Sequence, residues 1–199
     1  MHEVTAAGVL VPALDRAAAG QLPDWARVRL EREAHIARVA ALMDEWARAL
    51  TLPEPERRRW RAAAWLHDAL RDADPAELRD HVPPECRSLP GLLLHGPATA
   101  ARLRTEGVLD EALLNAVGYH TLGHPELDGA GRALYLADFL EPGRGFLPVW
   151  RASLRARMPG AMAPVLRDVV AARLRHLLDR GHPIRPETLA FWNVVAAER

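Results

Sequence analysis

Several features are missing from this sequence of 199 residues, and each absence excludes a class of protein. Cys86 is the only cysteine, so neither an intrachain disulfide nor a cysteine-based zinc site can form. No apolar run approaches the roughly 20 residues that a membrane-spanning helix needs. No basic region precedes the short apolar stretch at residues 9–11, so we expect no signal peptide and a cytoplasmic protein.

Lysine is absent as well. All 26 basic residues are arginines, and 26 acidic residues bring the net charge to zero. A chain without net charge has no long-range field that attracts duplex nucleic acid or a membrane surface, so we expect neither as a partner. A phosphate-binding site would have to be local. Its cations would be arginines, which bind pairs of oxygen atoms in a planar fork.

What remains is a helical pattern. Apolar residues recur at the spacing of helices, and no stretch alternates as a strand would. We therefore predict one all-α domain, a helical bundle with a C-terminal helical extension. Residues 1–23 are expected to form an N-terminal segment and residues 24–199 the domain. Within it, core motifs would span residues 32–144 and the C-terminal helices residues 148–199.

Local signals set the expected helix ends. The longer helices are predicted at residues 25–50, 56–71, 132–140 and 162–180. Asp74 and Asp110 are expected to cap helices, because a short carboxylate accepts hydrogen bonds from free backbone N–H groups. Pro75 is expected at a first helical position, where no N–H is needed, and a last helix is expected to follow Pro186.

Histidine and aspartate recur where these helices should be buried. They are His35, the adjacent pair His67-Asp68, His95, His120 and Asp138. Burying imidazoles and carboxylates costs several kcal/mol unless they are paired or bind a metal, and a shared cation would satisfy all of them. Nitrogen and oxygen donors suit Fe, Mn, Zn or Ni. The alternative is a helical protein with incidental buried polar residues, because a single such histidine is more often a core residue than a ligand.

The words around these residues resemble a known family. They read Arg32-Glu33-Ala34-His35, Leu66-His67-Asp68, Leu94-His95-Gly96-Pro97, Tyr119-His120-Thr121-Leu122-Gly123 and Tyr135-Leu136-Ala137-Asp138-Phe139-Leu140-Glu141-Pro142-Gly143-Arg144. The order of these motifs resembles that of the HD-superfamily metal-dependent phosphohydrolases. The motif sequences are similar to those of the YqeK-type symmetrical bis(5'-nucleosyl)-tetraphosphatases. The resemblance covers residues 32–144, with a looser match at residues 183–188.

The resemblance implies roles for individual residues. His35, His67, Asp68 and Asp138 would hold a divalent metal, expected to be iron, with Mn, Zn, Ni or Mg as alternatives. Asp68, His95 and His120 would be catalytic, and the two histidines could instead hold a second ion. The implied nucleotide contacts are His35, Asp68, Ala69, Leu70, Arg71, His95, His120, Thr121, Arg144, Asp179, Arg180, Gly181, His182, Pro183 and Ile184.

The implied activity is hydrolysis of diadenosine tetraphosphate and related dinucleoside polyphosphates to two nucleoside diphosphates by a metal-activated water. ADP would be the product, and a homodimer is left open. Arg71 stands where the family usually has lysine and keeps the charge, so function is expected to survive there. Gly118 stands where the family usually has a basic residue, and this departure removes a potential phosphate contact, for which His124 would be a partial substitute. Two alternatives therefore remain, another HD phosphohydrolase acting on mononucleotides or phosphodiesters, and a metal- or nucleotide-binding sensor without turnover.

Overall fold

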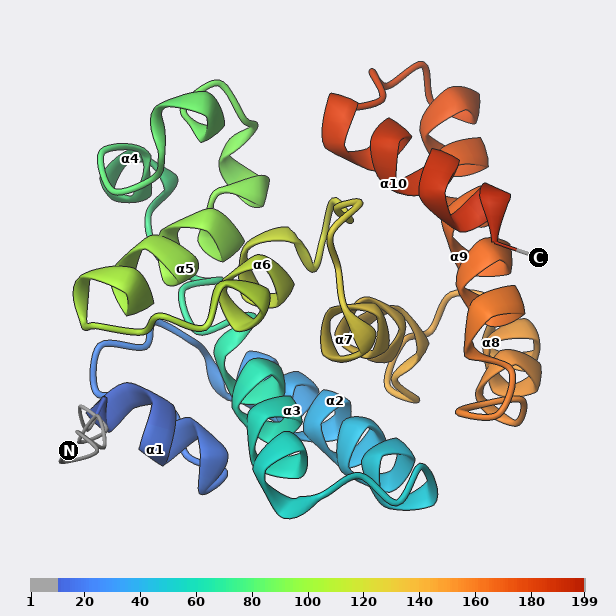
Figure 1. Ribbon diagram of the computed structural model, residues 1–199. Coiled ribbons are helices and arrows are strands. Elements are labelled where there is room, and N and C mark those ends of the chain that lie inside the picture. Colours follow the sequence, from blue (N-terminus) through green and yellow to red (C-terminus); the bar gives the residue numbers. More distant parts are fainter. Residues whose placement is uncertain (1–10, 199) are drawn as a thin grey trace, which may run out of the picture.

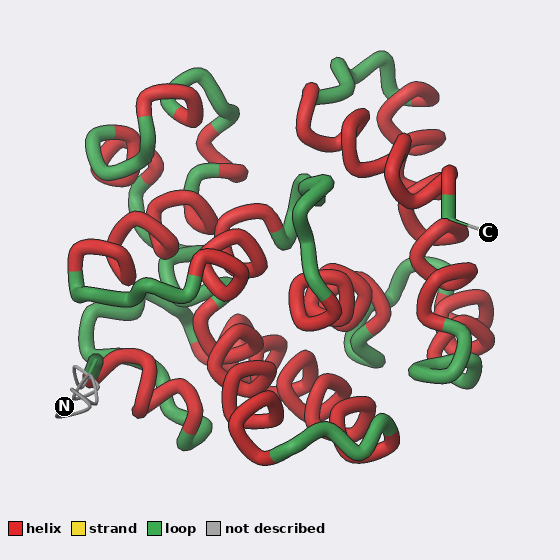
Figure 2. The backbone as a smooth tube through the Cα atoms, viewed as in Figure 1, coloured by secondary structure: helices red, strands yellow, loops and turns green. Residues whose placement is uncertain are grey.

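The computed structural model describes residues 11–198. This part of the chain folds into ten α-helices and two short 3-10 turns, with no strand (Figures 1 and 2). The helices are α1 (Pro12–Ala18), α2 (Leu30–Ala49), α3 (Glu54–Leu66), α4 (Pro75–Arg79), α5 (His95–Thr105), α6 (Glu111–Tyr119), α7 (Gly129–Leu140), α8 (Pro148–Arg155), α9 (Met162–Asp179) and α10 (Pro186–Ala197). The predicted all-α class is confirmed.

The structure also bears on membrane-spanning helices and on the predicted N-terminal segment. Among the described residues, no helix is both long and apolar enough to cross a membrane. The first ten residues of the predicted N-terminal segment lie outside the described part of the chain. The remainder of that segment includes α1, whose buried alanines lie against α3. The division at residue 24 stays a prediction.

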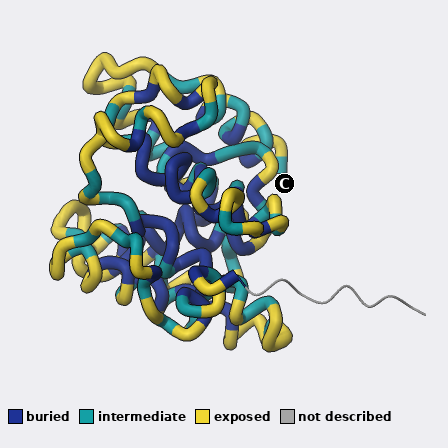
Figure 3. Tube along the Cα trace, turned by 90° about the vertical axis from the view of Figure 1, so that its left-hand side faces the viewer, coloured by how far each residue is buried: buried dark blue, intermediate teal, exposed yellow. Residues whose placement is uncertain are grey.

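The centre of the bundle is α7, which packs against α2, α3, α6, α8 and α9 (Figure 1). A helix with neighbours on so many sides must be apolar nearly all round. Nine of its twelve residues are buried, and Asp138 is the one carboxylate among them. Figure 3 shows the same pattern from the side, with buried segments gathered in the middle and exposed ones at the rim. The fold therefore delivers Asp138 to the interior.

The start of α2 and the end of α3 differ most from the prediction. α2 begins at Leu30, not at residue 25, and α3 ends at Leu66, not at residue 71. The cause is a contact between the two connecting segments. The N–H of Arg27 donates to the carbonyl of Ala69 (2.7 Å), and the carbonyl of Arg27 accepts from the N–H of Asp72 (3.0 Å). These backbone groups cannot also serve helices, so the chain turns directly after the helix that leads to His67 and Asp68.

The aspartate caps follow the prediction at α4 and α6, and the structure adds one at α7. Asp74 accepts from the N–H of Ala76, and Asp110 from the N–H of Leu113. Asp128 accepts from the N–H of Gly131, so α7 begins at Gly129 rather than at residue 132. The glycines at this end favour a loop by themselves, and the cap overrides that preference.

One arginine links two of these caps. Arg59 in α3 donates to Asp110 (2.6 Å) and to Asp128 (2.8 Å), which cap α6 and α7. Burial alone would lower the pKa of Arg59, but its two carboxylate partners raise it above its ordinary value. These hydrogen bonds of Arg59 set the relative positions of α3, α6 and α7. His67 and His120 directly follow the first two of these helices, and Asp138 lies in the third.

Replacing Arg59 by methionine should lower the free energy of unfolding by about 1–3 kcal/mol, because two carboxylates lose charge-assisted hydrogen bonds. Urea unfolding followed by circular dichroism measures this. Arg57→Met is the control, since Arg57 pairs with Glu54 on the surface of one helix and should contribute about 0.5 kcal/mol at most. Equal losses in the two variants would contradict the role given to Arg59.

Candidate metal centre

The six residues singled out in the sequence converge on one buried place. His35 comes from α2, His67 and Asp68 from the end of α3, His95 from the start of α5, His120 from the end of α6 and Asp138 from α7. None is more than 8% exposed. Nε2 of His35 lies 3.1 Å from Oδ1 of Asp138 and 3.4 Å from Nε2 of His67. Side chains that are up to a hundred residues apart thus meet, as predicted.

Three of the histidines are oriented by the same kind of local hydrogen bond. Each stands next to a helical turn, and its Nδ1 lies near the carbonyl three residues earlier. The distances are 2.6 Å from His67 to Ala64, 3.0 Å from His95 to Leu92 and 2.8 Å from His120 to Val117. A carbonyl oxygen can only accept, so Nδ1 must carry the hydrogen. In the neutral imidazole Nε2 then holds a lone pair, and it points into the cluster.

His35 lies inside α2, where the preceding carbonyls already accept helical hydrogen bonds. Its Nδ1 instead lies 3.2 Å from Oε1 of Glu141, a residue that is only 2% exposed. Burial alone would raise the pKa of Glu141, but hydrogen bonds from Arg38, the Gly143 N–H and His35 hold it below its ordinary value. The ionised carboxylate accepts, so Nε2 of His35 also presents a lone pair to the cluster.

Asp68 lies between two pairs of imidazoles. Its Oδ2 is 3.7 Å from His35 Nε2 and 3.6 Å from His67 Nε2. Its Oδ1 is 3.1 Å from His95 Nε2 and 3.5 Å from His120 Nε2, and those two nitrogens are 3.2 Å apart. One carboxylate therefore faces both halves of the cluster, one oxygen to each.

These contacts need positive charge. Lone pairs of nitrogen facing one another and facing carboxylate oxygens repel unless a proton or a cation lies between them. Burial lowers the pKa of His67 to about 4 and also lowers the pKa of His95, so protonation is disfavoured near neutrality. Separations of 3.1–3.5 Å match the spacing of donors around an ion at about 2.1 Å. The donor set thus fits one or two divalent cations.

The carboxylates are ionised despite their burial. Burial alone would raise the pKa of Asp68, but the surrounding imidazoles, above all His67, hold it well below its ordinary value. The pKa of Asp138 is lowered likewise, because the hydrogen bond from His35 and the charge of Arg144 outweigh desolvation. Two buried groups of three side chains could each hold an ion. One consists of His35, His67 and Asp138, and the other of His67, Asp68 and His120.

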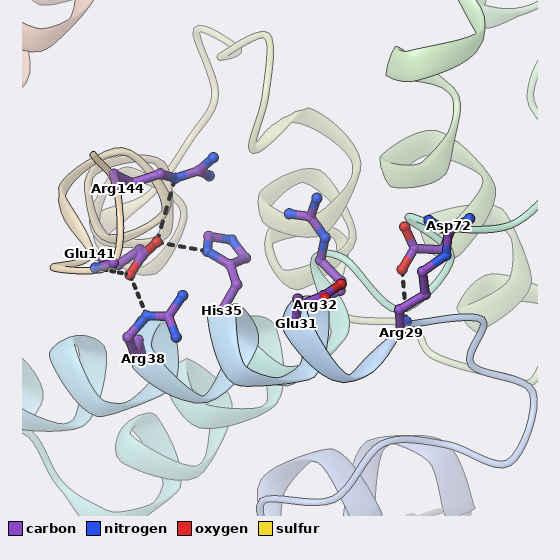
Figure 4. A pocket seen from close by; sticks show the side chains of 9 residues that line it. Arg29, Glu31, Arg32, His35, Arg38, Asp72, Glu141 and Arg144 are labelled. Atoms are coloured by element: carbon purple, nitrogen blue, oxygen red, sulfur yellow. Dashed lines mark hydrogen bonds and ion pairs between the residues drawn. The ribbon is translucent and has the colours of Figure 1, made fainter. Parts of the chain in front are cut away.

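A cavity of about 330 Å³ opens beside His35 (Figure 4). Its lining residues are Arg29, Glu31, Arg32, His35, Arg38, Asp72, Glu141, Gly143 and Arg144. Four of these are arginines, in a chain whose net charge is zero. Figure 4 shows Arg32, His35 and Arg38 along α2, with Glu141 and Arg144 opposite them at the end of α7. Glu31, Asp72 and Glu141 also line it, so the cluster adjoins a cavity in which arginines slightly outnumber carboxylates, and guanidinium groups can bind phosphate oxygens there.

Two cavity arginines contact the metal-ligand carboxylates. Arg32 donates to Oδ2 of Asp68 (2.9 Å), and Arg144 to Oδ1 of Asp138 (2.5 Å). Arg32 and Glu141 lie within the motifs that resemble the family but carried no predicted role. Arg29 and Arg38 were not among the predicted site residues. Helical spacing was the available signal for two of them, because Arg32 and Arg38 lie three residues before and after His35 on α2.

The predicted nucleotide contacts are scattered more widely. Ala69 is fully buried, Leu70 packs in a small apolar cluster around α4, and Arg71 donates to the carbonyl of Leu92. Oγ1 of Thr121 lies 3.0 Å from Nε2 of His120. The turn between α9 and α10 holds the other six, Asp179, Arg180, Gly181, His182, Pro183 and Ile184. Of these six only Ile184 is packed against the core, and their role in binding stays a prediction.

The C-terminal helices nevertheless reach the loop after His120. Arg173 of α9 donates to the carbonyl of Thr121, and Thr188 of α10 donates to that of Leu122. Gly123 has a left-handed φ of 77°, and a Cβ there would lie 2.2 Å from the ring of Phe191. Only glycine allows this turn and this close approach, so the loop that carries His120 is held by α9 and α10.

Gly118 lies where α5 and α6 pack closely. A Cβ at Gly96 would lie 2.8 Å from the Gly118 carbonyl, so Gly96 is the residue that needs to be glycine here. A Cβ at Gly118 would be in ordinary contact with the side chain of Ala100 at 3.4 Å. The packing at this point therefore does not explain the departure at Gly118.

Comparison with known proteins gives a consistent result. A family model described as the HD domain matches residues 32–143, more than half of the chain. A protein of Halalkalibacterium halodurans named symmetrical bis(5'-nucleosyl)-tetraphosphatase is 32% identical over 69% of this chain and 75% of its own. A protein of the same name from Bacillus subtilis is 31% identical over 62% of this chain and 61% of its own.

A solved structure shows the same fold. It is described as a predicted HD superfamily hydrolase involved in NAD metabolism from Clostridium acetobutylicum, and it matches with a TM-score of 0.74 at 22% identity. The match covers 86% of this chain and 92% of that one. Because the family model spans residues 32–143, which include all six residues of the buried cluster, the chain belongs to the HD-domain family.

Proposed function

We propose that this protein is a hydrolase that splits diadenosine tetraphosphate and related dinucleoside polyphosphates symmetrically into two nucleoside diphosphates. The carrying observation is Asp68, which lies between two imidazole pairs directly beside an arginine-lined cavity. The name of the two relatives supports the substrate class. A tetraphosphate chain is long and highly charged, and the cavity offers fork-shaped cations along its length.

His35, His67, Asp68 and Asp138 would hold the first divalent ion, for which we propose iron. His95 and His120, with the second oxygen of Asp68, are placed to hold another. When bound, such ions lower the pKa of a coordinated water and neutralise charge on phosphate oxygens. Asp68 faces both positions, so it orients the attacking water relative to the inner phosphorus.

The remaining side chains position substrate and move protons. Burial favours the neutral form of His95, so it donates a proton efficiently only after a phosphate chain brings negative charge beside it. Where no second ion occupies this half of the cluster, His95 and His120 would instead protonate or clamp the leaving phosphate oxygen. Arg144 and Arg32 border both the cavity and the cluster, and they would exchange carboxylate contacts for phosphate oxygens as the substrate enters.

The other predicted contacts complete this proposal. Arg71 and Thr121 lie beside the His95 and His120 half of the cluster, where the second nucleotide would extend. The turn at residues 179–184 would contact adenosine. A cytoplasmic location and a homodimer remain predictions from the sequence.

A nucleotide panel tests the substrate assignment against the two alternatives. With Mn²⁺ or Fe²⁺ restored, diadenosine tetraphosphate should yield ADP as the sole nucleotide product, as measured by ion-exchange chromatography. AMP with ATP would overturn symmetric cleavage. Preferred hydrolysis of a mononucleotide or phosphodiester would favour another HD phosphohydrolase, and tight ADP binding without any product would favour a sensor.

Replacing Asp68 by alanine should abolish metal binding and lower hydrolysis by at least about 1,000-fold, because both halves of the cluster lose their shared anion. Elemental analysis and turnover measure this, while circular dichroism checks that helicity is retained. Asp168→Ala is the control, since that carboxylate pairs with Arg157 on the surface. Wild-type turnover in Asp68→Ala would refute the site assignment.

Replacing Arg144 by methionine should raise KM for diadenosine tetraphosphate by about 10–100-fold, because a charge-assisted pair of contacts to phosphate is lost. Arg144→Lys should recover only part of this, since an ammonium cannot bind two oxygens as a fork. Arg104→Met is the control, because Arg104 pairs with Glu111 on the surface. Metal content is measured in each variant, and an unchanged KM with full metal content would contradict the proposal.

A further inference from the structure

The four cluster histidines are not held alike. His67, His95 and His120 each bind a backbone carbonyl three residues earlier, which their position beside a helical turn leaves within reach. His35 lies in the second turn of the twenty-residue helix α2, where the preceding carbonyls serve the helix itself. Its Nδ1 therefore needs a partner from elsewhere in the fold, and the partner found there is a carboxylate.

That carboxylate, Glu141, is fixed on both of its oxygens. Oε1 accepts from Nδ1 of His35 at 3.2 Å. Oε2 accepts from Nε of Arg38 and from the N–H of Gly143, each at 2.6 Å. Glu141 directly follows α7 and lies three residues after Asp138, so its backbone is tied to the helix that supplies a metal ligand. The guanidinium groups and the backbone N–H can only donate, so His35 is the one partner whose role depends on its tautomer.

Gly143 is part of this arrangement. A Cβ at this position would lie 2.5 Å from Nε and Nη2 of Arg38. The absence of a side chain lets the Gly143 N–H and the Arg38 guanidinium approach the same oxygen of Glu141. Both donors share Oε2, and Oε1 faces Nδ1 of His35 at 3.2 Å and, more distantly, Nε of Arg144 at 3.6 Å.

We propose that Glu141 is a positioning residue of the metal centre: its Oε1 fixes the tautomer and orientation of His35, and its Oε2 holds Arg38 at the wall of the cavity. A carboxylate behind an imidazole strengthens that imidazole as a ligand, and removing such a partner typically weakens metal binding by about 10–100-fold. A backbone carbonyl is a weaker partner than an anion. His35 is thus the one of the four histidines whose ligand strength is set by a replaceable side chain.

This inference rests on the metal site of the proposed function. It predicts that Glu141→Gln disturbs His35 although the substitution keeps the size of the side chain. The amide oxygen of glutamine must occupy the position of Oε2, because two N–H donors meet there. The amide NH₂ group then faces Nδ1–H of His35, donor against donor. His35 must give up its tautomer or its orientation, although the side chain keeps its size.

The experiment uses the full chain stripped of metal and titrated with Mn²⁺ alone. Glu141→Gln and Glu141→Ala should both bind Mn²⁺ about 10–100-fold more weakly than the wild type. Glu111→Gln is the matched control, since Glu111 also pairs with an arginine but lies on the surface, and it should bind as the wild type does. Thermal unfolding of the metal-free proteins shows whether each variant is folded, and Glu141→Gln decides the question if Glu141→Ala is not.

A second readout needs no metal. Imidazole ¹⁵N shifts of the metal-free wild type should report the Nδ1–H tautomer for His35, and Glu141→Gln should change it while the signals of His67, His95 and His120 stay. Mn²⁺ affinity within threefold of the wild type, with an unchanged His35 tautomer, would overturn the proposal. A wild type that binds no Mn²⁺ would instead remove the metal centre itself, which separates failure of the proposed function from failure of this inference.

Discussion

The buried carboxylate of Asp68 faces four imidazole nitrogens, and each of these presents a lone pair because its partner nitrogen donates to an oxygen. Such an arrangement is repulsive by itself and cohesive around a cation. Burial makes the protonated alternative expensive, as the lowered pKa of His67 indicates. The helices that enclose the cluster therefore leave a polar place suited to divalent ions within their apolar core.

The bundle supplies this place mostly through helix ends. α3 and α6 end next to His67 and His120, and free carbonyls at these ends orient the two imidazoles. His95 begins α5 and is oriented by the carbonyl of Leu92 in the 3-10 turn that precedes the helix. Arg59 links the capped starts of α6 and α7, and the glycine turn at Gly123 seats the loop after His120 against α10. The positions of the ligands are thus set by the same contacts that set the packing of the helices.

Charge is distributed to match the reaction. The whole chain is neutral, yet Arg29, Arg32, Arg38 and Arg144 line one cavity beside the cluster. Three of the four have an acidic contact within the site, which keeps their guanidinium groups in place without substrate. Glu141 connects the cavity and the cluster, because one oxygen faces His35 and the other holds the cavity arginine Arg38.

The sequence by itself determined the fold class and the residues of the cluster. It did so through helical periodicity, aspartate caps and the ordered motifs around His35, His67-Asp68, His95, His120 and Asp138. All of these are properties of short stretches of chain. It misplaced the ends of α2 and α3, because the contact between Arg27 and Ala69 joins segments about forty residues apart and no local pattern reports it. Only the tertiary structure decided that Glu141 stands behind His35, that Arg38 reaches the same carboxylate, and that Asp68 divides its oxygens between two imidazole pairs. These are contacts between side chains on different helices, and their geometry depends on how the helices pack.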